Sequence, residues 1–328
     1  MAGDRIYRTT LERMSADDLR ARLAAGPEEA ARWIYAAAVN GYAEAQAMWG
    51  QMLLDGRHVA ADPAAALRWF RIAASSGHLD GINMVGRCYE RGWGVAPDPA
   101  EAARWFRQAA DKGHDWARFN LATLLLKGEG VAPDVREALS LLVCAARRGH
   151  AKSMNLIGVC REQGWRGRVN MPSAIRWYRR AANGGCFRGS YHLGRFLATA
   201  GEIKEAAFRF QRAVDSAPAD FCRDAAAALL ARPEPELQTV GRRALLRATA
   251  SDNPADLFAY GRALALGRGG PADLAAAKVW LARATAKNYP GAAAALDDVL
   301  AREQSARWRA LRQSVTRLPV ALFGAGAH

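Results

Sequence analysis

A sequence motif with about a dozen characteristic positions recurs along this chain with a strict period of 36 residues. Each copy ends at a glycine, at Gly41, Gly77, Gly113, Gly149 and Gly185. An aromatic or apolar residue keeps the same spacing at Trp33, Trp69, Trp105, Leu141 and Trp177. A fixed period of this length is the signature of a repeat array, in which each copy is one small structural unit. Such units bury their apolar faces only by stacking on their neighbours.

Residues 79–113 show what one copy contains. Ile82, Val85 and Tyr89 form an apolar stripe at helical spacing, and a glycine-rich loop, RGWGVAPD, follows. Asp98 before Pro99 is the expected start of a second helix, because aspartate caps a helix and proline suits its first position. An apolar face then recurs at Ala102, Trp105, Phe106, Ala109 and Ala110. Each copy is therefore predicted to be a helix, a loop, a second helix ended by glycine, and a turn.

A glycine in the middle of each predicted first helix needs a separate reason, since it costs about 1 kcal/mol relative to alanine. The position is Gly50, Gly86, Ala122, Gly158, Gly194 and Gly261 in successive clear copies. We expect the second helix of the copy to approach so closely there that a side chain would not fit. The slot of Trp33, Trp69, Trp105, Trp177 and Trp280 is expected to be core.

These residues resemble the Sel-one-like repeat, a relative of the tetratricopeptide repeat. The shared pattern is A-x(2)-G-x(2)-Y-x(2)-G-x-G-V-x(2)-D followed by A-x(2)-W-[FY]-x(2)-A-A-x(2)-G, and residues 79–113 follow it almost throughout. The resemblance implies an all-α fold, a right-handed superhelical solenoid of stacked antiparallel helix pairs. It also implies that the first helices of the pairs line a concave face.

The resemblance divides the chain into three parts. Residues 1–42 are expected to form a degenerate N-terminal capping helix pair, with Ser15 and Asp18 as its capping box. Residues 43–288 are the repeat array, clear over 43–198, degenerate over 199–253 and clear again over 254–288. Residues 289–328 are expected to form C-terminal capping helices and an apolar tail, LPVALFGAGAH, for which disorder and docking on the last repeat or on a partner both remain open.

Composition limits the location and the class of partner. The chain has 328 residues and a formal net charge of +14, which favours acidic partners or nonspecific attraction to nucleic acid. Its five cysteines are odd in number and form no CxxC pair, so neither a disulfide framework nor a zinc site is expected. The charged N-terminus does not fit a secretory signal, and no apolar stretch is long enough to span a membrane. We therefore expect a cytoplasmic protein.

Catalytic chemistry finds little support in the sequence. His78, His114 and His150 each follow a turn glycine one repeat apart, too far from one another to share a metal ion, and are interpreted as structural. No nucleophile elbow, zinc-protease helix, P-loop or dinucleotide-binding motif is present. The sequence therefore predicts no enzyme, no metal and no cofactor.

Partner-binding residues are sought in the variable slots of the first helices. Arginine beside an aromatic or amide side chain suits a peptide backbone or carboxylate, because its fork donates two hydrogen bonds together. The candidates are Asn83, Arg87, Phe119, Asn120, Asn155, Tyr191, His192, Arg195, Phe258 and Arg262. Three pairs, Asn83 with Arg87, Tyr191 with Arg195 and Phe258 with Arg262, are expected to project together.

The leading hypothesis is a non-enzymatic adaptor that holds an acidic or extended protein segment along the concave face, in bacterial signalling or envelope-related regulation, as the resemblance implies. The alternative is a basic solenoid that binds nucleic acid or an anionic membrane surface through its arginines. For the membrane, the basic stretch around Trp308 before the apolar tail is the candidate.

Overall fold

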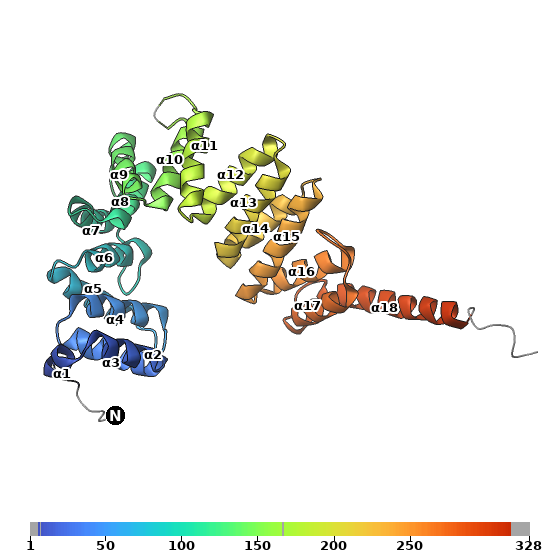
Figure 1. Ribbon diagram of the computed structural model, residues 1–328, viewed down its shortest axis with the longest axis horizontal. Helices are drawn as coiled ribbons and strands as arrows, with labels where there is room; N and C mark the ends of the chain where they lie inside the picture. Colours follow the sequence, from blue (N-terminus) through green and yellow to red (C-terminus); the bar gives the residue numbers. More distant parts are fainter. Residues whose placement is uncertain (1–5, 7, 166, 316–328) are drawn as a thin grey trace, which may run out of the picture. The chain divides into compact units, whose positions relative to one another are not determined.

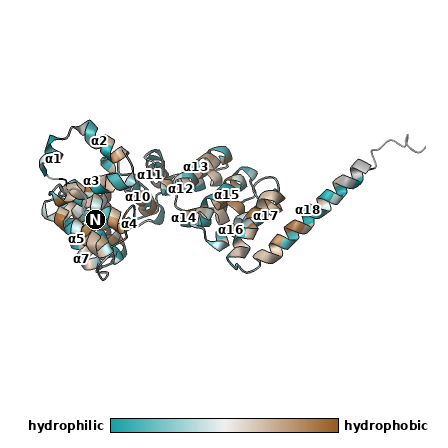
Figure 2. Ribbon diagram, turned by 90° about the horizontal axis from the view of Figure 1, so that it is seen from below, coloured by the Kyte–Doolittle hydropathy of each residue, from teal (hydrophilic) through white to brown (hydrophobic). Residues whose placement is uncertain are grey.

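The computed structural model describes residues 6, 8–165 and 167–315. These residues form eighteen α-helices and one short 3-10 helix, with no β-strand among them (Figure 1). The helices carry hydrophilic and hydrophobic residues side by side along their length (Figure 2), as amphipathic elements do. The predicted all-α class is confirmed. The chain divides into two compact units, residues 1–184 and residues 185–328.

Unit 1 is built of helix pairs in chain order. Its helices are α1 (Arg8–Arg13), α2 (Ala16–Ala24), α3 (Pro27–Val39), α4 (Ala43–Asp55), α5 (Pro63–Ser75), α6 (Leu79–Arg91), α7 (Pro99–Asp111), α8 (Asp115–Lys127), α9 (Val135–Arg147), α10 (Ala151–Gln163) and α11 (Met171–Asn183). The most extensive contacts join α4 to α5, α6 to α7, α8 to α9 and α10 to α11, and each second helix also packs on the next first helix. This is the predicted stack of antiparallel pairs.

Unit 2 continues the pattern with shorter loops. Its elements are α12 (Phe187–Thr199), α13 (Ile203–Ser216), α14 (Ala219–Leu230), α15 (Pro235–Ala248), η1 (Thr249–Ser251), α16 (Pro254–Leu266), α17 (Leu274–Ala286) and α18 (Ala292–Val315). The stretch predicted as the most degenerate pair, 219–250, forms the pair α14 and α15. A final pair was expected over 289–317, whereas one 24-residue helix, α18, occupies that stretch and packs on α17 and α16. The apolar tail from residue 318 lies outside the described residues.

The predicted caps set the helix boundaries. The Asp98 carboxylate accepts hydrogen bonds from the backbone N–H groups of Ala100 and Glu101, both at 3.0 Å. The same role falls to Asp62, Asp134, Asn170 and Asp273. Gly92 ends α6 in the left-handed conformation, with φ of 75°, which a residue with a side chain adopts only with strain. At the N-terminus, the Ser15 hydroxyl caps α2 by accepting from the Asp18 N–H.

The two helices of a repeat meet at the mid-helix glycine. A β-carbon added at Gly86 would lie 2.7 Å from ring atoms of Phe106, which is closer than real contacts allow. The same clash would occur between Gly50 and Phe70, and between Gly158 and Tyr178. The expectation of a close helix approach is confirmed. The contacting group is an aromatic ring, however, rather than the alanines of the second helix alone.

The ring that fills this space is the residue after the recurring tryptophan. Phe70, Phe106 and Tyr178 are completely buried. Of the five tryptophans expected in the core, Trp33 is buried, whereas Trp69, Trp105, Trp177 and Trp280 are only partly buried. The indole N–H of Trp105 donates to Glu101 at 2.8 Å, so this side chain keeps its polar edge at the surface.

The glycine and the ring should therefore be coupled in stability. We expect Gly86→Ala to destabilise the protein by about 1–3 kcal/mol, because overpacking outweighs the gain in helix propensity. Adding Phe106→Leu recreates the pair that Ala122 and Leu142 form naturally one repeat later. The double variant should then be more stable than the sum of the two single effects, by at least about 0.5 kcal/mol in urea unfolding. Strictly additive free energies would show that the contact does not set the helix spacing.

Candidate partner-binding face

The first-helix face is the side of each unit formed by the first helices of the pairs, α4, α6, α8 and α10 in unit 1 and α12, α14 and α16 in unit 2. In unit 1, histidines hold its helix ends in place. The ring Nδ1 of His78 accepts from the Gly81 N–H, while Nε2 lies 2.8 Å from Glu44 of the preceding repeat. His114 caps α8 in the same way, and its Nε2 lies 2.9 Å from Asp80. The structural interpretation of these histidines is confirmed.

His150 departs from that scheme. The position that carries Glu44 and Asp80 in the earlier repeats is Trp116 here, whose ring meets the His150 ring edge to face at 4.8 Å. The Nδ1 atom contacts Ser153, whereas the buried Nε2 atom has no hydrogen-bond partner among the described residues. Burial lowers the pKa of His150, partly offset by the charge of Asp115 and reinforced by Lys152 and His114.

This burial should make stability depend on pH. The unfolded chain binds a proton at His150 near the ordinary pKa of 6.5, whereas the folded chain resists it. The free energy of unfolding should therefore fall as the pH drops below about 6.5, and the contribution is constant above that value. We expect His150→Asn, which retains a capping side chain, to weaken the fall measured by urea unfolding between pH 7.5 and 5.5. The same change at exposed His58 serves as the control for the substitution itself.

A hollow of about 480 Å³ lies on the first-helix face of unit 1, between α6 and α8. It brings together four of the predicted residues, Asn83, Arg87, Phe119 and Asn120. Asn120 Nδ2 donates to Asn83 Oδ1 at 3.0 Å, which ties the two first helices to each other. The Arg87 guanidinium lies 4.9 Å from the Trp93 ring centre, and burial lowers its pKa. The predicted pair of Asn83 and Arg87 thus lines one hollow, although Asn83 is only 6% exposed.

Phe119, within the hollow, and Asn155, outside it, have different surroundings. Phe119 packs edge to face on Trp116, at 6.4 Å between ring centres, and on the ring of His150. Asn155 is buried and lies outside the residues that line the hollow. Its Oδ1 atom has no hydrogen-bond partner among the residues described.

The candidates on α12 in unit 2 form a local cluster. Tyr191 lies 5.2 Å from the ring centres of both Phe210 and Phe221. Burial raises the pKa of the Tyr191 phenol, and the charge of Arg195 partly offsets this effect. An Arg195 N–H group lies 3.1 Å from His192 Nδ1, so the arginine expected to project beside Tyr191 engages His192.

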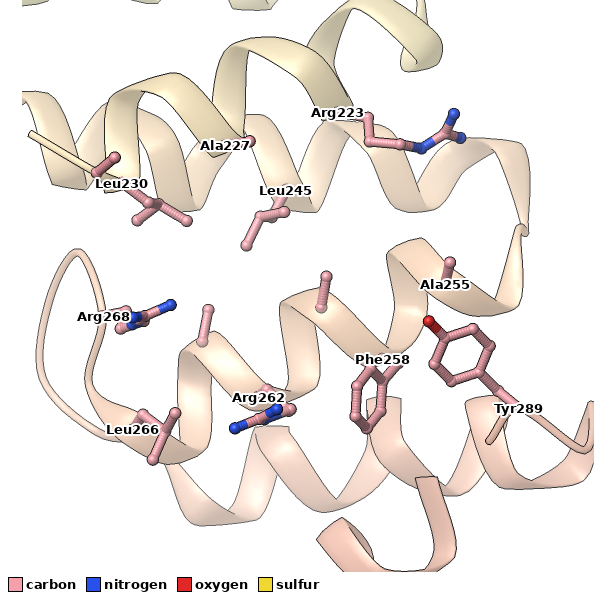
Figure 3. Close-up of a pocket in the computed structure, with 13 residues that line it drawn as sticks. Arg223, Ala227, Leu230, Leu245, Ala255, Phe258, Arg262, Leu266, Arg268 and Tyr289 are labelled. Carbon is pink, nitrogen blue, oxygen red and sulfur yellow. The ribbon is translucent and has the colours of Figure 1, made fainter. Parts of the chain in front are cut away.

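A groove of about 590 Å³ lies between α14 and α16 of unit 2, and we call it the α14–α16 groove (Figure 3). Its lining residues are Arg223, Ala227, Leu230, Ala231, Leu245, Ala255, Phe258, Ala259, Arg262, Ala263, Leu266, Arg268 and Tyr289. The predicted pair of Phe258 and Arg262 does project together, with the guanidinium 5.6 Å from the ring centre. Figure 3 shows Arg268 reaching from its loop into the gap between the two helices, whereas Arg262 lies beside α16 near Phe258.

The two helices of the groove are joined at one end by an ion pair between a buried carboxylate and a partly exposed guanidinium. Arg223 of α14 makes two hydrogen bonds of 2.6 Å to the carboxylate of Asp256 on α16. Asp256 is 1% exposed and also accepts from the Ser251 hydroxyl at 2.9 Å. Hydrogen bonding to this carboxylate raises the pKa of Arg223. The pair fixes the separation of α14 and α16 at the groove's end.

Removal of the two partners should have unequal effects. Arg223→Met leaves a buried carboxylate with only a hydroxyl donor, and we expect a loss of about 3 kcal/mol in the free energy of unfolding. Asp256→Asn removes the buried charge and leaves Arg223 with access to water, so its effect should be at least about 1 kcal/mol smaller. Urea unfolding measures both. For comparison, Arg283→Met breaks an exposed pair with Asp252 and should change stability by less than about 0.5 kcal/mol; losses of equal size for all three would contradict this account.

Several residues of this face were not among the sequence candidates. Arg268 belongs to the contracted loop GRGGPAD after α16, and Tyr289 follows the turn after α17. Both lie outside the first helices, which supplied all the sequence candidates. Trp116 had a detectable signal, because it stands where the preceding repeats carry acidic residues.

The comparisons with known proteins follow the same repeat boundaries. The family model described as the Sel1 repeat matches residues 43–78, 79–114, 117–150, 151–186 and 254–289, which together make up more than half of the chain. The chain belongs to the Sel1 repeat family. Proteins of this family are generally protein-interaction scaffolds and are typically non-catalytic. Among curated proteins, the search gave no match to this Sel1 repeat protein.

One solved structure supports the fold, and two others are similar to the chain at lower TM-scores. A Sel1 repeat protein from Oxalobacter formigenes is similar over 87% of each chain, with 22% identity and a TM-score of 0.51. A protective antigen of uropathogenic Escherichia coli with an SLR fold shares 24% identity over 83% of this chain and 67% of its own, with a TM-score of 0.40. An immunity protein from Pseudomonas aeruginosa shares 16% identity over 64% of this chain and 82% of its own, with a TM-score of 0.48.

No group of three or more histidine, cysteine or acidic side chains is placed to hold a metal ion in the part of the chain that the structure describes. Over the same residues, no helix is both long and apolar enough to cross a membrane.

Proposed function

We propose that this Sel1 repeat protein is a non-enzymatic scaffold that binds an acidic, extended protein segment along its first-helix face. One observation carries the proposal. Arg262 and Arg268 line the α14–α16 groove, and neither makes an ion pair with a carboxylate among the described residues. Asp and Glu are absent from the groove's lining residues, so this surface presents uncompensated positive charge beside apolar walls.

The residue types in the groove favour binding over catalysis. Alanine, leucine and arginine make up most of its lining, and the remaining residues are Phe258 and Tyr289. No histidine, cysteine, serine or carboxylate lines it, so a nucleophile with an adjacent base is not present among the described lining residues.

The distribution of arginine favours a protein partner over nucleic acid. Many arginines outside the groove are held in ion pairs, which reduces the field that a phosphate backbone would meet. Examples are Arg107 with Glu137, Arg118 and Arg148 with Asp115, Arg209 with Glu205, and Arg243 with Asp215. A groove whose lining carries arginine and no carboxylate fits an acidic segment of limited length.

The setting that we propose is the bacterial cytoplasm, in signalling or envelope-related regulation. All five cysteines are free thiols, and four of them are buried. Burial raises the pKa of Cys88 and of Cys160 to about 11, so these thiols stay protonated and unreactive at neutral pH. Free thiols in this number are compatible with a reducing compartment.

Charge reversal on the first-helix face tests the scaffold proposal. We expect the triple variant Arg87→Glu, Arg195→Glu, Arg262→Glu to lose its partners in a pull-down from the native host, with recovery reduced at least about tenfold. The matched control, Arg136→Glu, Arg147→Glu, Arg179→Glu, makes the same change in net charge on second helices and should retain them.

The salt dependence of binding separates the two partner classes. Partners that survive 0.3 M salt and are lost only by the first-helix variant support the proposal. Equal losses in both variants, together with a steep fall in RNA or DNA binding as salt rises, would instead identify a nucleic-acid-binding protein.

A further inference from the structure

We infer that the α14–α16 groove recognises an extended peptide in which an acidic side chain and a bulky apolar side chain stand two positions apart. This inference rests on the proposed scaffold function and adds to it the location of one binding site and the spacing of the two side chains that it selects. Charge, groove shape and the spacing of residues along α16 each contribute a step.

The charge of the groove selects a carboxylate. Three arginines line it, but the Arg223 guanidinium is already neutralised by the buried carboxylate of Asp256. Arg262 and Arg268 come from α16 and from the loop that follows it, and both line the groove. Two guanidinium groups without a carboxylate partner in the described chain can hold one carboxylate between them, each through charge-assisted hydrogen bonds.

The shape of the groove selects an apolar neighbour. Phe258 packs on Tyr289 at 4.9 Å between ring centres, and together they form an aromatic wall. Three small residues, Ala227, Ala255 and Ala259, also line the groove and leave space for a bulky side chain. Burial of a leucine-sized side chain there removes apolar surface from water on both the peptide and the protein.

The spacing of these two subsites follows from helix geometry. Phe258 and Arg262 are four residues apart on α16, which places their Cα atoms about 6 Å apart along the helix axis. In an extended peptide, residues two positions apart point to the same side and lie about 6.6 Å apart. Adjacent residues point to opposite sides, so they cannot occupy both subsites together. The groove thus matches a peptide whose acidic and apolar side chains are two positions apart, in either chain direction.

Nucleic acid fits this groove less well than a peptide does. The groove's two aromatic side chains, Phe258 and Tyr289, pack on each other and do not form a row of separate rings on which successive bases could stack. Among its lining residues, the groove also has only two guanidinium groups without a carboxylate partner, whereas a nucleic-acid strand carries a phosphate at every nucleotide.

Short labelled peptides test the spacing directly with the full chain by fluorescence anisotropy. The probes are Gly/Ser-flanked peptides that contain Leu-Ser-Glu or Glu-Ser-Leu. Matched controls of the same composition place Leu and Glu next to each other, and a further control replaces Glu by Gln. We expect at least about tenfold weaker binding for the adjacent and Gln peptides than for the better of the two spaced peptides.

Variants of the protein place the binding in the groove. The double variant Arg262→Ala, Arg268→Ala should bind the spaced peptide at least about tenfold more weakly. Phe258→Ala should also bind this peptide more weakly but should keep the preference for Glu over Gln. Arg212→Ala, an exposed arginine on α13, is the control and should change affinity less than about twofold. Circular dichroism melting confirms that each variant is folded.

The outcomes distinguish this inference from the scaffold proposal. Equal affinity for spaced and adjacent peptides, or full affinity in the double arginine variant, overturns the groove assignment. In that case, partner recovery in the pull-down can still depend on the first-helix arginines. The scaffold proposal then stands, and the protein binds its partner at another part of the first-helix face. A short single-stranded RNA that binds more tightly than every peptide, with the same loss in the double variant, also overturns the inference.

Discussion

The contact between a mid-helix glycine and a buried ring holds three of the clear repeats together, those of Gly50, Gly86 and Gly158. Gly86 on α6 and Phe106 on α7 are in contact because the glycine has no side chain, and any β-carbon there would collide with the ring. This allows the helix axes to approach, and the close pair presents a flat apolar side to the next repeat. The glycine's cost in helix propensity is offset by the burial of a complete aromatic side chain. A period of 36 residues follows, since every repeat must offer its neighbour the same surface.

Because the repeats stack regularly, the distinctive features of the surface occur where a repeat differs from the common motif. In unit 1, Trp116 replaces an acidic residue, so His150 loses its carboxylate partner and becomes buried against the indole. In unit 2, the contracted loop after α16 adds Arg268 to the groove that Arg262 also lines. Both changes lie on the first-helix face. They alter its charge and shape while the glycine contacts and the helix caps remain in place.

Net charge alone is a poor guide to where this protein would bind. The excess of +14 is spread over the whole chain, and many arginines are paired with carboxylates of their own or a neighbouring helix. The Arg223 and Asp256 pair shows the difference most clearly, because the same groove contains one neutralised guanidinium and two without a partner carboxylate. Recognition depends on those that remain, since a paired guanidinium has already used the hydrogen bonds that a ligand would need.

The sequence by itself determined the helix pairs, their caps and the family, because these depend on contacts within one repeat that recur at fixed spacing. Asp98 caps α7 and Gly92 ends α6 whatever lies beyond them. Only the tertiary structure decided which side chains share a surface. It buried Asn155, paired Arg195 with His192, replaced an expected terminal pair with α18 alone, and joined Arg262 to Arg268 and Tyr289 in one groove. These outcomes depend on how neighbouring repeats differ from one another, and a repeating pattern carries no information about contacts between its exceptions.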